Sequence, residues 1–301
     1  MADRRTNDGT PRWDLRIGEE GYPQMLLDLE NPPEMIHGVG SIEVLSTMYL
    51  GVIGTRLATP YGMATASMAG RVAAESGITL VSCGAMGCDA AALRGALDAG
   101  GRAVVVSGVG ADRIYPKSSR DVFERAPRQG GAVIALAPWG AEVHRFAFLQ
   151  RNTIIAALST ALVVCEAGQR SGTTSTALAA TELGREVYAV PGSVFSPESQ
   201  GANALIRDGA HIITSESDLE LLISRDFGVL RLVQEKPASP RGRVLSALVA
   251  SPMRADDLAN HLGMAPLELL RILADYEVAG AVKRLADGRY AATEETLLGQ
   301  M

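Results

Sequence analysis

Short apolar runs recur between residues 49 and 214, and most of them are separated by alanine-rich stretches. The runs lie at residues 49–53, 78–82, 102–107, 132–136, 161–166, 187–191 and 211–214. Because the apolar residues in these runs do not alternate with polar ones, they are typical of strands buried on both faces. The stretches between them predict helices over residues 61–76, 89–99, 174–183 and 217–224. Alternating strands and helices predict a parallel, doubly wound α/β sheet over residues 49–225.

The segment before this alternation has little periodicity. Residues 1–48 contain the breaker Asn31-Pro32-Pro33 and no long apolar run. We therefore expect residues 1–48 to form an extension that packs on the core domain.

The segment after the alternation predicts a second, smaller domain. Residues 226–241 include Glu235-Lys236-Pro237-Ala238-Ser239-Pro240, which is typical of a linker. Residues 242–292 predict three short helices and then a hairpin with the turn Asp287-Gly288. Three helices and a hairpin are typical of a winged-helix domain.

Composition and charge exclude some classes of protein and indicate the cellular compartment. Hydrophobic residues make up 47% of the 301 residues, which excludes a disordered chain. The formal net charge of −6 argues against coating of nucleic acid through bulk charge but leaves a local basic groove open. The three cysteines, Cys83, Cys88 and Cys165, fit a reducing compartment. Because no apolar run reaches about 20 residues and the N-terminus has no apolar signal core, we expect a soluble cytoplasmic protein.

Glycine-rich turns follow five of the predicted strands. The carboxyl ends of parallel strands share one edge of a sheet, where glycine permits close approach of a ligand and helix N-termini direct N–H groups at anions. The turns therefore predict a phosphate-binding edge, although strand–helix turns also use glycine for purely structural reasons. They are Gly54-Thr55-Arg56, Cys83-Gly84-Ala85-Met86-Gly87, Gly108-Val109-Gly110, Gly168-Gln169-Arg170-Ser171-Gly172-Thr173 and Pro191-Gly192-Ser193.

Residues for catalysis or metal binding are few. The chain has no G-x-x-x-x-G-K-[ST] loop and no G-x-G-x-x-G, and its four histidines are scattered. Asp89 and Glu166 lie near the glycine-rich edge and are candidates for acid–base chemistry. We interpret Asp89 instead as a helix cap and Glu166 as ordering the loop beside Arg170. Cys83 is either a reactive thiol or a buried bystander.

Two further features bear on nucleic-acid binding. Phe148 precedes Arg151-Asn152, so an aromatic ring that stacks a base would lie beside a group that holds its phosphate. The alternative is a core phenylalanine at the entry of a helix. The third helix of the winged-helix domain carries three acidic residues against Arg271, so we expect it to contact protein or to have a structural role rather than to read a DNA groove.

Several motifs resemble, in order, those of the bacterial DprA/Smf family over about residues 15–224. They are Gly54-Thr55-Arg56 with Thr59-Pro60-Tyr61-Gly62, Gly87-Cys88-Asp89-Ala90-Ala91-Ala92 with Arg94-Gly95-Ala96-Leu97, Asp112-Arg113-Ile114-Tyr115-Pro116, Arg151-Asn152 with Ile154-Ile155-Ala156, Arg170-Ser171-Gly172, Pro191-Gly192-Ser193, and Asn203 with Leu205-Ile206-Arg207-Asp208-Gly209-Ala210. The C-terminal domain also resembles the winged helix of many members. The chain is identified as a member of this family or as a diverged paralogue.

The resemblance implies an extended Rossmann-like domain that binds single-stranded DNA, forms a homodimer and loads the RecA recombinase in natural transformation. It implies no catalysis and no cofactor. The scattered histidines and cysteines and the short apolar runs lead us to expect no metal and no membrane contact. Binding or hydrolysis of a small phosphorylated nucleotide at the same edge is the alternative function. The residues expected to bind DNA or phosphate are Gly54, Thr55, Arg56, Gly84, Phe148, Arg151, Asn152, Arg170, Ser171, Gly172, Gly192 and Ser193.

This chain departs from the family pattern at three basic positions. The family's S-G-L-A-R-G has Met86 in place of its arginine, and the family's F-P-R-R-N-R has Gln150 and Thr153 in place of two arginines. Each lost phosphate contact would lower the salt slope of single-strand binding by about 0.7. We therefore expect weaker binding than the motif alone implies, and tighter binding when positions 150 and 153 are changed to arginine.

Overall fold

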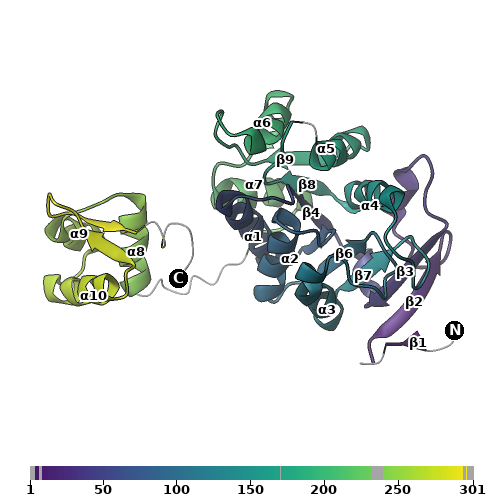
Figure 1. Ribbon diagram of the computed structural model, residues 1–301, viewed down its shortest axis with the longest axis horizontal. Coiled ribbons are helices and arrows are strands. Elements are labelled where there is room, and N and C mark those ends of the chain that lie inside the picture. The colour runs from purple at the N-terminus through teal and green to yellow at the C-terminus, as the bar shows by residue number, and fades with distance from the viewer. Residues whose placement is uncertain (1–3, 7–8, 170, 232–239, 294–295, 297–301) are drawn as a thin grey trace. The chain divides into compact units, whose positions relative to one another are not determined.

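A computed structural model of the chain describes residues 4–6, 9–169, 171–231, 240–293 and 296 (Figure 1). It consists of two compact units, residues 1–232 and 233–301. Within the described residues, no helix has both the length and the apolar character needed to cross a bilayer.

Ten strands among the described residues of the larger unit form one sheet, in the order β1-β2-β3-β7-β6-β5-β4-β8-β9-β10. The strands from β4 to β10 run parallel, whereas β1, β2 and β3 add antiparallel strands beyond β7. Their bounds are β1 Arg4–Arg5, β2 Pro11–Arg16, β3 Met35–Gly40, β4 Tyr49–Ile53, β5 Thr79–Ser82, β6 Ala103–Ser107, β7 Ala132–Ala135, β8 Ala161–Val164, β9 Glu186–Ala189 and β10 His211–Ile212.

The doubly wound, mainly parallel sheet predicted from the apolar runs is confirmed, and each of the seven runs overlaps one of the strands β4 to β10. The three N-terminal strands carry no such signal. β2 is mostly half-buried or exposed, so its residues need not be apolar. Its pairing with β3, and the pairing of β3 with β7, hold this segment in the sheet.

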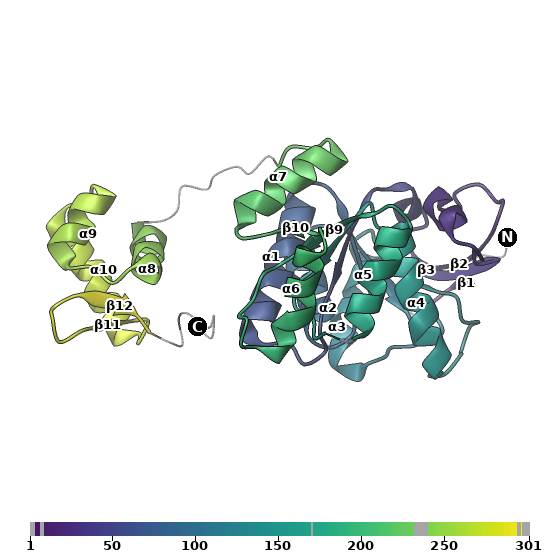
Figure 2. The ribbon, with the colours of Figure 1, turned by 90° about the horizontal axis from the view of Figure 1, so that it is seen from above.

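Helices cover both faces of the sheet. Alternate residues along one strand point to opposite faces, so Leu50 and Val52 lie in one core and Tyr49 and Ile53 in the other. The first core lies under α1, α2, α3 and α7, and the second under α4, α5 and α6, which lie side by side (Figure 2). The bounds are α1 Pro60–Glu75, α2 Cys88–Asp98, α3 Arg120–Arg128, α4 Arg145–Leu158, α5 Gly172–Glu182, α6 Gln200–Arg207 and α7 Glu216–Phe227.

The chain order of the strands creates a switch point between β4 and β8. From β4 the chain proceeds through β5 and β6 to β7 on one side, and then crosses to β8, β9 and β10 on the other. The loops that leave β4 and β8 therefore diverge and leave a crevice at their carboxyl ends. Thr55 N–H donates to the Glu166 carbonyl across this point at 2.8 Å.

The smaller unit is a winged helix, as predicted. It comprises α8 Pro240–Ala250, α9 Ala255–Leu262, α10 Pro266–Val278 and the hairpin β11 Val282–Arg284 with β12 Tyr290–Ala292. Apolar side chains from all three helices form its core, including Val244, Leu258 and Leu269. Residues 232–239, half of the predicted linker 226–241, lie outside the described residues.

Candidate nucleic-acid interface

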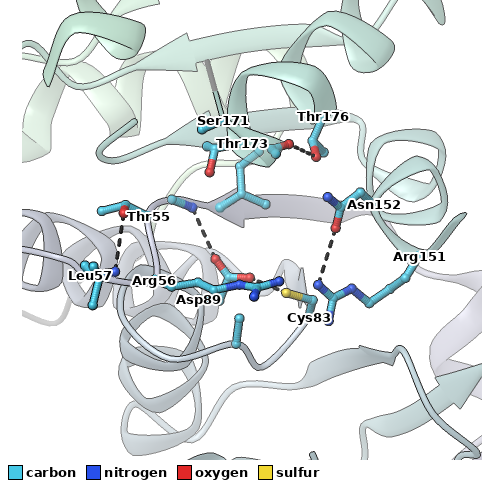
Figure 3. A pocket seen from close by; sticks show the side chains of 14 residues that line it. Thr55, Arg56, Leu57, Cys83, Asp89, Arg151, Asn152, Ser171, Thr173 and Thr176 are labelled. Carbon is cyan, nitrogen blue, oxygen red and sulfur yellow. Dashed lines mark hydrogen bonds between the residues drawn. The ribbon is translucent and has the colours of Figure 1, made fainter. Parts of the chain in front are cut away.

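A cavity of about 400 Å³ opens at the switch point (Figure 3). The loops after β4, β5 and β8 and the helices α2, α4 and α5 bring its walls together. The structure thus gathers seven of the expected binding residues in one place. They are Gly54, Thr55, Arg56, Arg151, Asn152, Ser171 and Gly172, and the wall is completed by Ile53, Leu57, Cys83, Ala85, Asp89, Thr173 and Thr176.

Two buried carboxylates hold the loop that carries Arg56. Asp89 accepts a hydrogen bond from Gly54 N–H at 3.1 Å and another from the Cys83 thiol. Glu166 accepts from the N–H and the hydroxyl of Thr59, at 2.9 and 2.8 Å. Burial raises the pKa of Asp89. Each acid therefore fixes the backbone that follows β4.

These contacts correct the interpretation of Asp89 as a helix cap. Asp89 does not cap its own helix, because the N-cap of α2 is Gly87 and no side chain caps it. Glu166 orders the loop before α1 through Thr59. Its role in the loop beside Arg170 stays a prediction, because Arg170 lies outside the described residues. Asp89 and Glu166 both contact partners that lie far away in the sequence, where local pattern gives no signal.

The N-terminus of α5 supplies hydrogen-bond donors to the cavity. Ser171 caps the helix by accepting from Thr174 N–H at 3.2 Å, and Ser171 N–H donates to the Thr174 hydroxyl at 3.1 Å. The first N–H groups of an α-helix have no acceptor within the helix, and the first residues of α5, Gly172 and Thr173, belong to the cavity wall. Together with the helix dipole, they favour an anion at this position.

Two guanidinium groups contact one aromatic ring beside the cavity. Arg56 and Arg151 lie over the ring of Phe148, at 5.8 and 5.2 Å from its centroid, and Tyr115 packs against the same ring at 5.8 Å. Phe148 is half-buried and belongs to neither core, which argues against the alternative of a core phenylalanine. A space of about 50 Å³ separates this group from Ala85 and Met86.

Arg151 is the more constrained of the two cations. It is only 5% exposed, and its Nε has no hydrogen-bond partner. Among the described residues, the only side chain that accepts a hydrogen bond from the Arg151 guanidinium is that of Asn152, through Oδ1 at 3.4 Å. A buried guanidinium with unused donors is costly unless a ligand supplies an acceptor, so Arg151 points to an anionic ligand.

The remaining expected residues lie elsewhere. Gly84 faces the core, because a Cβ added there would lie 2.8 Å from the ring of Phe123, although its neighbours Cys83 and Ala85 line the cavity. Gly192 and Ser193 are not part of the described wall, and Gly192 pairs through its backbone with the Asn203 side chain. Arg170 lies outside the described residues.

Met86, Gln150 and Thr153, the neutral residues at the family's three basic positions, line two different cavities. Met86, which is 47% exposed, lies beside Phe148 and Arg151. Gln150 and Thr153 line a different cavity of about 560 Å³, whose wall also carries Asp28, Glu30 and Glu182. Position 86 is therefore the one of the three that adjoins the candidate site. The expectation for positions 150 and 153 changes accordingly, because arginines there would meet carboxylates.

Tyr115 is a part of the site that the sequence pattern does not predict. It occurs in the motif Asp112-Arg113-Ile114-Tyr115-Pro116, where nothing marks it as a neighbour of Phe148. Among the described residues, no group of His, Cys, Asp and Glu side chains is arranged to hold a metal ion.

The cysteines give a first testable expectation. All three are buried, and burial raises the pKa of Cys83 and of Cys88 to about 12 and the pKa of Cys165 well above its usual value. We expect no thiol to react with Ellman's reagent at pH 8 in the folded protein and all three to react in guanidinium chloride. A rapid reaction of one thiol in the folded protein would restore Cys83 as a reactive group.

Comparisons with known proteins identify relatives of the chain. A family model described as DNA recombination-mediator protein A matches residues 14–223, and one described as DprA winged helix domain matches residues 233–288. The chain is 36% identical to a putative DNA processing protein DprA of Mycobacterium tuberculosis over 84% of this chain and 66% of that protein. It is 30% identical to protein Smf of Escherichia coli over 89% of this chain and 74% of that protein. The chain thus spans just under two thirds of the Mycobacterium relative.

Two solved structures are similar to the chain. The crystal structure of DprA from Streptococcus pneumoniae matches with 32% identity and a TM-score of 0.65, covering 69% of this chain and 72% of that chain. A structure of DprA from Helicobacter pylori, described by its single-stranded DNA binding mode, matches with 28% identity and a TM-score of 0.64 over 71% of this chain and 97% of that chain.

Proposed function

The chain belongs to the DprA/Smf family of DNA recombination-mediator proteins, and from this membership we propose that it binds single-stranded DNA at the switch-point cavity. The observation that carries the proposal is the contact of the guanidinium groups of Arg56 and Arg151 with the ring of Phe148, because both arginines also line the cavity that contains the first residues of α5. An aromatic ring that stacks a base and cations that hold its phosphates are the two elements of single-strand recognition.

We propose that Gly54, Thr55, Arg56, Phe148, Arg151, Asn152, Ser171 and Gly172 form the central binding surface. Gly84 would act by shaping the turn between Cys83 and Ala85, and Gly192 and Ser193 would contact a strand that extends along the edge of the sheet. Arg170 would add a phosphate contact from the loop before α5.

The role is binding rather than catalysis. The carboxylates of Asp89 and Glu166 are already occupied in holding the loop after β4. A general base needs free access to the proton that it abstracts. This supports a mediator in preference to hydrolysis of a phosphorylated nucleotide.

The test is fluorescence anisotropy of labelled oligo-dT with the full chain at several salt concentrations. If Arg56 and Arg151 each hold a phosphate, log K should fall against log salt with a slope of about −1.4 from these two contacts. Phe148→Leu keeps an apolar side chain but removes stacking, and should weaken binding about 5- to 100-fold. Absence of binding at low salt, together with release of ribose from a nucleotide, would favour the nucleotide-hydrolysing alternative.

We further propose that the protein acts in the cytoplasm as a homodimer that protects incoming DNA and loads RecA during natural transformation. The support is the family membership. The expected result is faster RecA-dependent ATP hydrolysis on single strands coated with single-strand-binding protein, together with a dimeric mass by light scattering. A monomer that leaves the RecA rate unchanged would contradict this part of the proposal alone.

Added charge should act differently at the neutral positions. Met86→Arg places a third cation beside Phe148 and should steepen the salt slope by about 0.7 and tighten oligo-dT binding. The matched double variant Gln150→Arg with Thr153→Arg carries more charge but lies among Asp28, Glu30 and Glu182. We expect it to leave the slope nearly unchanged. Equal steepening by both variants would show that DNA also follows the second cavity.

A further inference from the structure

The helix α10 of the winged helix is apolar on two opposite sides. One side buries Leu269, Ile272 and Leu273 in the core of the domain. The other side exposes Leu267 by 75%, Leu270 by 47% and Val278 by 91%, and Ala274 between them is exposed as well. A helix on the surface of a globular domain normally has polar residues opposite its core face.

The exposed apolar residues form one continuous stripe. At about 100° per residue, positions 267, 270, 274 and 278 fall within roughly 80° of one another around the helix axis. With a rise of about 1.5 Å per residue, the stripe is roughly 16 Å long. Its width and length correspond to the seam that a partner helix of about three turns would cover.

The charges beside the stripe are mostly acidic. Glu277 lies on one side of it, and Glu268 and Asp275 lie on the other, with Arg271 at the margin. This is the helix that a winged helix commonly inserts into the major groove of DNA. Carboxylates on both sides of an apolar stripe would repel phosphates and would leave the apolar residues against water. The surface is therefore unsuited to nucleic acid.

We propose that the exposed face of α10 docks an amphipathic helix of a partner protein, with an apolar stripe bordered by lysine or arginine. The leucines would pack against the partner's apolar side chains, and Glu268 and Glu277 would pair with its cations. A second copy of α10 fits less well, because its own acidic margins would face those of the first copy. This role is separate from the DNA site, which lies in the other unit of the chain.

The test uses the full chain and two synthetic peptides of about 18 residues, or roughly five helical turns. Both carry the same leucine stripe, which is bordered by lysines in one peptide and by glutamates in the other. We expect the lysine peptide to bind at least about 10-fold more tightly than the glutamate peptide by fluorescence anisotropy. The double variant Leu267→Gln with Leu270→Gln should weaken lysine-peptide binding about 10-fold.

Three matched measurements make the result specific. Leu178→Gln changes an equally apolar, 58% exposed residue on α5 and should leave peptide binding unchanged. Glu268→Lys with Glu277→Lys should reverse the preference toward the glutamate peptide. Binding of oligo-dT should be the same in all these variants, because none of the changed residues lines the DNA cavity.

The proposal is overturned if the two peptides bind equally well, or if the substitutions on α10 leave binding of the lysine peptide unchanged. It is also overturned if light scattering shows self-association of the wild-type chain that Leu267→Gln with Leu270→Gln abolishes. In that case a second copy of the chain, rather than a basic partner helix, occupies the stripe.

Discussion

Replacement of Arg56 by alanine is expected to weaken oligo-dT binding by roughly 10- to 100-fold without loss of the fold. Arg56 is exposed, lines the cavity and lies over Phe148. A charge-assisted hydrogen bond contributes about 1.5–3 kcal/mol, and 1.4 kcal/mol corresponds to a factor of ten in affinity. The salt slope should fall by about 0.7 as one phosphate contact is lost.

The matched control is Arg120→Ala. Arg120 is also an exposed arginine, but it lies on α3 and pairs with Glu124 at 3.2 Å. It has the same formal charge, so any general effect of charge on DNA binding appears in both variants. The test reads affinity by anisotropy and the fold by circular dichroism. Equal losses of affinity in the two variants would mean that binding follows net charge rather than the switch-point cavity.

The sequence predicts the central sheet well because its strands are buried on both faces. Residues such as Leu50 and Val52 are buried beneath helices on one face, and their neighbours Tyr49 and Ile53 are buried on the other. Continuous apolar runs follow from this, and the parallel order places the glycine-rich turns at one edge. β2 lacks the signal because it depends on pairing with β3 rather than on its own apolar residues.

The sequence predicts the candidate site less completely because its geometry depends on distant contacts. Asp89 binds the backbone of Gly54, 35 positions away in the sequence, and Glu166 binds Thr59, 107 positions away. No local sequence pattern predicts either contact. The packing of the Tyr115 ring against Phe148 could not be predicted either, because these residues also lie far apart in the sequence.

The residues around Phe148 could not be assigned to a surface from the sequence, because the helix α4 was not predicted. Residues 148, 150 and 153 lie close together in the sequence, which suggested one basic surface. They belong to α4, where about 100° per residue places Gln150 and Thr153 on the side away from Phe148. Without the helix, sequence neighbours cannot be assigned to a face. With it, the two neutral residues belong to the separate acidic cavity.

Replacement of Gly87 by alanine is expected to cause the largest loss of stability among the variants discussed. Gly87 has φ +82°, and an added Cβ would lie 2.3 Å from the carbonyl oxygen of Thr55 and 2.8 Å from that of Arg56. Both neighbours are backbone atoms, so the loop must move. We expect the free energy of unfolding to fall by about 2–5 kcal/mol, the sum of left-handed backbone strain and overpacking.

The other end of the same helix provides the control. Gly100 follows α2, has φ +77° and would meet no atom within 4 Å if it carried a Cβ. Gly100→Ala should therefore cost only the backbone strain, about 1–2 kcal/mol. Urea denaturation measures both values, and their difference isolates the collision with the loop.

Because that collision displaces Thr55 and Arg56, the folded fraction of Gly87→Ala should also bind oligo-dT more weakly, whereas Gly100→Ala should bind normally. Equal losses of stability in the two variants would show that the β4–α1 loop does not depend on the close approach of Gly87, and that Arg56 is positioned by the carboxylates of Asp89 and Glu166 alone.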